Sequence, residues 1–210
     1  MFSIIKNYFN KRNLKDKNYS FLFDKYSDNE YVCFDCETTG LNPDIDDIIS
    51  IGAVVIKNNT IISSRKFVRF VKPKTKLQAE AIKVHHIREC DLANAEEIDD
   101  VIIDFINFIG NRPLIGYFLE FDISMINKYL KPKLGITLPN KSLEVSEIYH
   151  DHKIELIPQG YIDLRFNTIM EELEIPSLGK HDAYNDAIMT AMIFIKLQNI
   201  EKKAKRSISI

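Results

Sequence analysis

Hydrophobic residues in the first third of the chain gather into short runs separated by polar turns. The runs lie at 31–36, 48–56 and 61–71, and the second is rich in β-branched residues. Runs of this length bounded by turn residues predict β-strands. Residues 57–60 (Lys-Asn-Asn-Thr) are typical of a hairpin turn, because asparagine tolerates a positive φ angle. The pattern therefore predicts a three-strand antiparallel meander.

Beyond Pro73 the apolar spacing changes to the three-to-four-residue period of helices. Helices are predicted at 77–84, 98–109, 121–130 (ended by Pro132), 164–173 and 182–200, with a short strand at 113–117, a loop at 131–142 and a strand-to-helix segment at 143–150. A meander followed by alternating helices and strands favours an α/β fold, a mixed sheet of antiparallel and parallel strands flanked by helices. We expect an N-terminal extension at 1–30, the main domain at 31–200 and a basic C-terminal tail at 201–210.

Composition and charge narrow the class of protein. A chain of 210 residues suits one α/β domain. No apolar run approaches the length of a membrane span, and no signal peptide is evident. Three cysteines cannot form a disulfide framework, so a cytoplasmic location is expected. The net charge is −2, but it is unevenly distributed: residues 1–27 and 196–210 are basic, and residues 28–195 are acidic. This distribution suits a metal-loaded site that binds phosphate, and equally a solvated acidic surface.

The stretch from Phe34 to Leu41 carries the first candidate chemistry. Asp35 and Glu37 stand two residues apart at the end of a predicted strand, so both side chains point to the same face. Two adjacent carboxylates repel unless a cation lies between them or one takes a proton. Oxygen ligands on a rigid strand suit Mg²⁺ or Mn²⁺. The alternative is a strand end with two solvated acids.

Two further acidic positions lie near predicted helix starts. Asp122 follows Phe121 at the start of one helix, and Asp186 lies one turn inside the last helix. His181 precedes that last helix and Asp182 is placed to cap it. Acids at helix starts and on solvated helix faces are also common without any function. The small residues around Asp186 predict a closely packed helix: Ala183, Ala187 and Ala191.

Together these stretches resemble a known family. The stretch Phe-Asp-Cys-Glu-Thr-Thr-Gly-Leu at 34–41, Phe-Asp at 121–122 and His-Asp-Ala-Tyr-Asn-Asp-Ala at 181–187 are similar to the three motifs of the DEDDh 3′–5′ exonucleases. This family includes the epsilon proofreading subunit of bacterial DNA polymerase III. The resemblance covers roughly residues 30–200. One departure is Tyr117-Phe118, which stands where the family usually has His-Asn near the substrate.

The resemblance implies a ribonuclease-H-like fold and an exonuclease domain at 31–200. It implies that two divalent metal ions, Mg²⁺ or Mn²⁺, are held by four catalytic carboxylates: Asp35, Glu37, Asp122 and Asp186. His181 is implied as the general base. We expect a closed pocket around the last nucleotide, with substrate contacts from Thr38, Thr39, Gly40, Leu41 and Phe121. Core packing is an equal expectation for Phe121.

The function expected from this resemblance is metal-dependent release of 5′-mononucleotides from the 3′ end of single-stranded DNA. Proofreading or DNA repair, with a DNA polymerase as partner, is the expected setting. One alternative is a 3′–5′ exoribonuclease of the RNase T or oligoribonuclease type, because no residue reads the 2′-hydroxyl unambiguously. A second alternative is an inactive, polymerase-associated module that binds nucleic acid.

Overall fold

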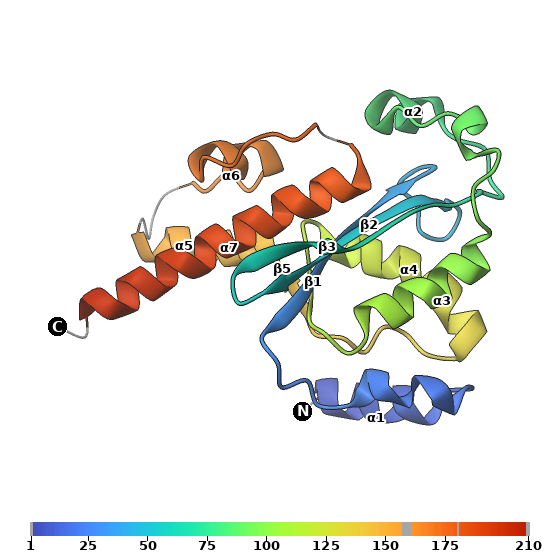
Figure 1. Cartoon of the computed structure of the whole chain (residues 1–210), viewed down its shortest axis with the longest axis horizontal. Helices are drawn as coiled ribbons and strands as arrows, with labels where there is room; N and C mark the ends of the chain where they lie inside the picture. Colours follow the sequence, from blue (N-terminus) through green and yellow to red (C-terminus); the bar gives the residue numbers. More distant parts are fainter. Residues whose placement is uncertain (1, 157–160, 180, 209–210) are drawn as a thin grey trace.

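A five-stranded mixed sheet lies at the centre of the protein (Figure 1). The computed structural model describes residues 2–156, 161–179 and 181–208. The strands are β1 (Glu30–Thr38), β2 (Ile48–Lys57), β3 (Thr60–Phe70), β4 (Leu114–Gly116) and β5 (Ser142–Glu144). Their order is β3-β2-β1-β4-β5. The first three form the predicted antiparallel meander, and β4 and β5 run parallel to β1.

Helices cover both faces of the sheet (Figure 1). One face packs against α3 (Ile98–Ile109) and α4 (Leu119–Leu134). The other packs against α5 (Val145–Leu156), α6 (Phe166–Glu172) and α7 (Ala183–Ile208). The remaining elements are α1 (Phe2–Arg12), the 3₁₀ helix η1 (Lys17–Phe23), α2 (Ala79–His85) and the 3₁₀ helix η2 (Glu89–Leu92). This is the expected α/β architecture of a mixed sheet between two helical layers.

Strand β1 divides its side chains between the two layers. Val32, Phe34 and Cys36 belong to the apolar cluster on the α3 and α4 face. Cys33 belongs to the cluster on the α7 face. Because side chains alternate along a strand, Asp35 and Glu37 point to the same side as Cys33, toward α7.

Helix α7 comes unusually close to the sheet at Gly52. A Cβ atom added there would lie 2.2 Å from the backbone nitrogen of Tyr184. Ala183, Ala187 and Ala191 are all buried, as expected for a closely packed helix. Gly52 is also the register partner of Asp35 across the β1–β2 pair. The missing side chain at Gly52 therefore sets how near α7 comes to the acids of β1.

The N-terminal segment packs on the end of α4. Asn10 exchanges two hydrogen bonds with the Thr137 backbone, donating to its carbonyl at 2.8 Å and accepting from its N–H at 3.0 Å. The N–H of Lys15 donates to the Leu134 carbonyl at 2.9 Å. Leu14 and Leu22 are buried in the main apolar cluster. These contacts join the segment to the domain.

The ends of two predicted helices were wrong, and the strand-to-helix segment predicted at 143–150 continues as α5 to Leu156. Helix α4 continues through Pro132 to Leu134, because Leu134 is buried and the left-handed Gly135 closes the helix with a bond to the Lys131 carbonyl. Helix α7 passes Ile200 and reaches Ile208, because residues 201–206 (Glu-Lys-Lys-Ala-Lys-Arg) all favour helix. Residues 209–210 of the predicted tail lie outside the described residues. No helix in the described part of the chain has the length and apolarity to cross a membrane.

Candidate active site

Three carboxylates from two elements meet at the C-terminal end of the central strand β1. Asp35 and Glu37 come from β1, and Asp186 comes from the first turn of α7. One oxygen of each lies within 4.8 Å of the others. Glu37 is buried, whereas Asp35 and Asp186 are half-buried. Acids that are 149 residues apart in the chain, from Glu37 to Asp186, therefore share one small volume.

Asp122 reaches the same place from α4. Its side chain is buried, and its Oδ1 accepts a hydrogen bond from the Cys36 N–H at 3.0 Å. Cys36 is the residue between Asp35 and Glu37, so this bond holds α4 against the acidic end of β1. Asp122 lies outside the tight trio of oxygens, but its charge acts on Asp35.

The carboxylates perturb one another strongly. Burial raises the pKa of Asp35 well above its usual range, and the charges of Asp122 and Glu37 raise it further. Burial, with the charge of Asp186, raises the pKa of Glu37 to about 7. Burial likewise raises the pKa of Asp122. A divalent cation among these oxygens would relieve the repulsion, and all-oxygen ligands suit hard cations, so the residues fit a divalent metal site.

His181 stands at the entrance to α7. Its backbone is left-handed, with φ at 63°, and its N–H donates to Asp186 Oδ2 at 3.0 Å. The residue is exposed. Asp182 Oδ1 accepts from the Asn185 N–H at 2.9 Å, which is the predicted helix cap. The turn therefore brings the backbone of His181 to the carboxylate of Asp186 and leaves the residue accessible.

His85, the last residue of α2, lies near the site. Its side chain is buried, and its Nδ1 accepts from the Ile87 N–H at 3.0 Å. The neutral ring therefore carries its proton on Nε2, which makes no hydrogen bond within the described residues. Burial lowers the pKa of His85, and the neighbouring charges of His86 and His181 lower it further.

The loop after β1 is held in a narrow space. Thr38 Oγ1 donates to the Gly40 carbonyl at 2.6 Å, and the Thr39 N–H donates to the Asp47 carbonyl at 2.9 Å. A Cβ at Gly40 would lie 2.3 Å from Gln78 Nε2 and 2.5 Å from Asp46 Oδ2, so a larger residue would have to displace these side chains. Leu41, in contrast, is 84% exposed. The loop presents an apolar side chain on a rigid backbone beside the acids.

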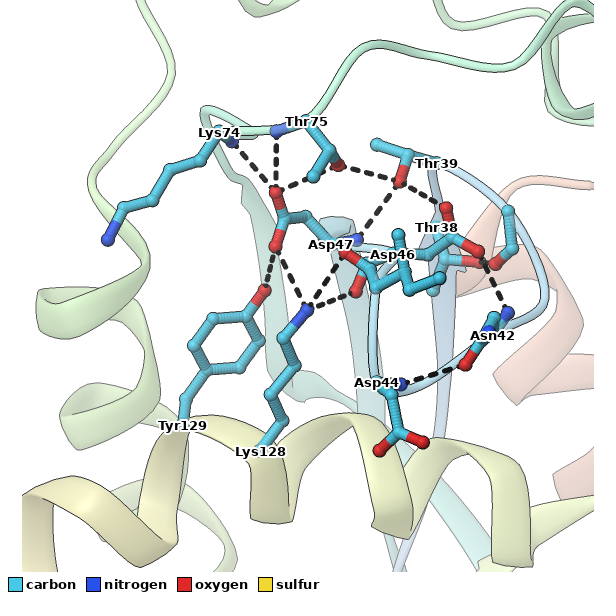
Figure 2. Close-up of polar contacts among 12 residues, drawn as sticks. Thr38, Thr39, Asn42, Asp44, Asp46, Asp47, Lys74, Thr75, Lys128 and Tyr129 are labelled. Carbon is cyan, nitrogen blue, oxygen red and sulfur yellow. Dashed lines mark hydrogen bonds and ion pairs between the residues drawn. The ribbon is translucent and has the colours of Figure 1, made fainter.

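Asp47 connects this loop to two other segments (Figure 2). Its Oδ2 accepts from the backbone N–H groups of Lys74 and Thr75 at 2.9 and 2.7 Å. Its Oδ1 accepts from the Tyr129 hydroxyl at 2.7 Å and pairs with Lys128 Nζ at 3.3 Å. Although burial opposes ionisation, the bonds from Tyr129 and Thr75 lower the pKa of Asp47 to about 2. Nothing in the residue pattern had pointed to this network.

The two residues that depart from the family's usual His-Asn, Tyr117 and Phe118, differ in their surroundings. The Tyr117 hydroxyl donates to the Leu164 carbonyl at 3.0 Å and accepts from the Phe166 N–H at 3.1 Å, so it joins β4 to α6. Phe118 is 70% exposed and left-handed, with φ at 58°. Its ring stacks on half-buried Phe121, with centroids 6.3 Å apart. The two phenylalanines form an aromatic surface beside Asp122.

Relatives with this pattern are found by sequence. The chain is 35% identical over 181 residues to a DNA polymerase III of the PolC type from Caldanaerobacter subterraneus, covering 86% of this chain and 12% of that protein. It is 30% identical over 174 residues to the DNA polymerase III subunit epsilon of Aquifex aeolicus, covering 83% of each. The chain thus spans about an eighth of the length of the PolC-type relatives that it matches.

Solved structures with the same fold share little sequence. Exonuclease I of E. coli in complex with a dT13 oligonucleotide superposes with a TM-score of 0.71 at 15% identity, over 85% of this chain and 43% of that one. Cell-death related nuclease 4 gives 0.71 at 17% identity, over 82% of this chain and 64% of that one. These likenesses show the fold. The family model described as Exonuclease (RNase_T), which does not by itself distinguish DNA from RNA as the substrate, matches residues 32–194. Because this match covers more than half of the chain, the chain belongs to that exonuclease family.

Proposed function

We propose that this protein is a metal-dependent 3′–5′ exonuclease that releases 5′-mononucleotides from single-stranded DNA. The observation that carries this proposal is the meeting of Asp35, Glu37 and Asp186 within 4.8 Å, with buried Asp122 bonded to the Cys36 N–H beside them. The two alternatives from the sequence, an exoribonuclease and an inactive binding module, can each be tested against this proposal. An inactive binding module would need no such set of mutually repelling acids, two of them half-buried and two buried.

The four carboxylates would hold two divalent ions, Mg²⁺ or Mn²⁺. When bound, the ions supply an activated water and neutralise charge on the departing 3′-oxygen. His181, exposed next to Asp186, accepts the proton of the attacking water on an imidazole nitrogen. The water oxygen bonds to phosphorus, the bond from phosphorus to the 3′-oxygen breaks, and the 3′-oxygen takes a proton from solvent.

The loop of Thr38, Thr39, Gly40 and Leu41 would receive the terminal nucleotide. Its backbone is fixed by the bonds to Asp46 and Asp47, while Leu41 is exposed and available to a base. Phe121 and the exposed Phe118 offer a second apolar surface for stacking. Stacking on such surfaces tolerates any base, so we expect little sequence preference.

A DNA polymerase is the proposed partner, and replication or repair in the cytoplasm is the proposed setting. The support is the 30% identity to a DNA polymerase III subunit epsilon over 83% of both chains. The PolC-type relatives carry a matching region within a much longer polymerase. These relatives favour DNA over RNA as the substrate.

A nuclease assay tests the proposal. Matched DNA and RNA oligonucleotides, blocked at the 3′ or the 5′ end, are incubated with Mg²⁺, Mn²⁺ or EDTA. We expect 5′-mononucleotides from DNA with a free 3′ end, and no product in EDTA or with Asp35→Ala, Asp186→Ala. Faster cleavage of RNA would favour the exoribonuclease, and equal activity of the double variant would refute the site.

A further inference from the structure

The segment that leads from β3 into α2 carries exposed lysines next to the site. We call residues 72–83 the lysine segment. Its four lysines are all exposed, and none makes an ion pair within the described part of the chain: Lys72, Lys74, Lys76 and Lys83. Glu80 is the only acidic residue between 72 and 88. We propose that the lysine segment binds the phosphate backbone of the strand whose 3′ end lies in the site, an inference that rests on the proposed exonuclease function.

The lysine segment is hydrogen-bonded directly to the nucleotide loop. The Gln78 N–H donates to the Thr39 carbonyl at 3.1 Å, and Gln78 Nε2 donates to Asp46 Oδ1 at 3.0 Å. A strand that leaves the loop therefore meets this segment first on that side. The phosphates beyond the terminal nucleotide would pass over the lysines.

The backbone of the segment is anchored so that its lysines face solvent. Asp47 Oδ2 accepts bonds from the Lys74 N–H, the Thr75 N–H and, at 2.9 Å, the Thr75 hydroxyl. Figure 2 shows the Lys74 side chain extending away from Asp47. Lys72, Lys74 and Lys76 are exposed, whereas the intervening residues at 73, 75 and 77 are half-buried. Three exposed cations are thus carried by a backbone that is hydrogen-bonded in place at residues 74 and 75.

Charge balance explains why a strand needs this surface. The buried carboxylates beside the loop repel phosphate until metal ions bind. Two arginines near the segment are already paired, Arg69 with Glu96 at 3.1 Å and Arg88 with Asp91 at 3.1 Å. The lysines are not, so they are the cations that remain to bind a polyanion. An acidic protein segment would suit the same charges, but the bonds to the loop favour the substrate strand.

The test compares two triple variants of the full chain. The first is Lys72→Ala, Lys74→Ala, Lys76→Ala. The matched control is Lys25→Ala, Lys131→Ala, Lys141→Ala, which removes three exposed lysines elsewhere on the surface. Each protein cleaves a dinucleotide and an oligonucleotide of about 12 nucleotides, between about 50 and 200 mM salt. Binding of the labelled oligonucleotide is also measured by anisotropy in EDTA, so that the test does not depend on cleavage.

We expect the first variant to raise the KM for the oligonucleotide roughly tenfold at low salt and to reduce the salt slope of binding by about 2, since each phosphate contact on a single strand contributes about 0.7. The rise in KM should be smaller for the dinucleotide than for the oligonucleotide, and the control variant should match the wild type. An unchanged salt slope, or an equal loss on both substrates, would overturn the proposal. Tighter competition by polyglutamate than by DNA would assign the surface to an acidic protein instead. If the wild-type protein cleaves neither substrate, the proposed exonuclease function is refuted. The role of the lysines is still tested in that case, by the binding of the oligonucleotide in EDTA.

Discussion

Asp122 accepts a hydrogen bond from the backbone N–H of Cys36 at 3.0 Å, across 86 positions of the chain. The peptide that donates this bond lies between Asp35 and Glu37, so one side chain of α4 holds both acids of β1 in place. The same carboxylate adds negative charge to the site and raises the pKa of Asp35. Asp122 therefore has a structural task as an acceptor and a proposed task as a metal ligand, and the two can be separated by mutation.

The separating variants are Asp122→Asn and Asp122→Ala. The asparagine keeps an oxygen for the Cys36 N–H and removes the charge, so the metal-free protein should unfold at the same or a higher temperature. Its Mn²⁺ affinity, measured by calorimetry, should fall at least about tenfold. The alanine leaves the buried N–H without a partner and should cost about 1–3 kcal/mol of stability. Wild-type Mn²⁺ binding by the asparagine variant would remove Asp122 from the ligand set.

The close approach of α7 to Gly52 predicts that a larger residue at this position disturbs the same site. Gly52→Ala adds a Cβ atom that would lie 2.2 Å from the backbone nitrogen of Tyr184, so α7 must move away from β2. We expect a loss of about 3 kcal/mol in urea unfolding, together with weaker metal binding because Asp186 moves with α7. Ala53→Gly is the control, since it alters the next residue of β2 on the opposite face. Full metal affinity in the Gly52→Ala variant would show that the spacing of α7 is not critical.

The Asp47 network predicts that the nucleotide loop depends on α4. Lys128 Nζ donates to the carbonyls of Ile45 and Asp46 at 3.2 and 2.7 Å and pairs with Asp47. Lys128→Met should loosen the loop and raise the KM for DNA several-fold with little change in kcat. Lys131→Met, an exposed lysine in the following turn of the helix, is the control. A fall in kcat at unchanged KM would place Lys128 in the chemistry instead.

Phe118 combines strain with exposure, so stability and binding should respond in opposite directions. A bulky residue at φ 58° costs about 1–2 kcal/mol. Phe118→Gly should therefore raise the unfolding temperature by a few degrees, and it should raise the KM for single-stranded DNA roughly tenfold through lost stacking. Phe118→Tyr keeps the ring and should keep the KM. An unchanged KM in the glycine variant would exclude a role in binding.

Glu30 predicts a pH dependence of stability at the other end of β1. The carboxylate accepts two bonds from Arg65, at 2.8 and 3.0 Å, and one from Arg112 Nε at 2.9 Å, and Lys57 lies at 3.1 Å. The bonds from Arg65 above all lower the pKa of Glu30 from 4.5 to about 2. A lowered pKa stabilises the fold above the unfolded value, and this gain is lost as the pH falls from about 4.5 toward 2.

The variant that checks this is Glu30→Gln. Urea unfolding should show it about 2 kcal/mol less stable than wild type near neutral pH, with the difference shrinking below about pH 4. Asp99→Asn removes an exposed acid that pairs with Lys133 at 3.7 Å and should change little. A difference that stays constant down to about pH 2 would mean that packing, not charge, accounts for the effect.

Local pattern was enough for most of the elements, and resemblance to the motifs of a known family supplied the candidate residues of the site. The β-branched runs and the Lys57–Thr60 turn predicted the meander, and the i, i+2 spacing of Asp35 and Glu37 predicted a shared face, because alternation along a strand is a property of the backbone alone. The small residues around Asp186 likewise predicted the close approach of α7. The predicted end of α4 was wrong because burial of Leu134 and a left-handed Gly135 outweigh Pro132 in its last turn.

Other features depend on contacts between residues far apart in the chain, which no local spacing encodes. The bond from Cys36 to Asp122, the convergence of Lys74, Thr75 and Tyr129 on Asp47, and the fit of Tyr184 over Gly52 each join segments that only the packed sheet brings together. Residue order alone supplied the acids and their chemistry. Packing decided their distances, their burial and therefore their pKa values, because electrostatic energy depends on separation in space and on exclusion of water rather than on separation along the chain.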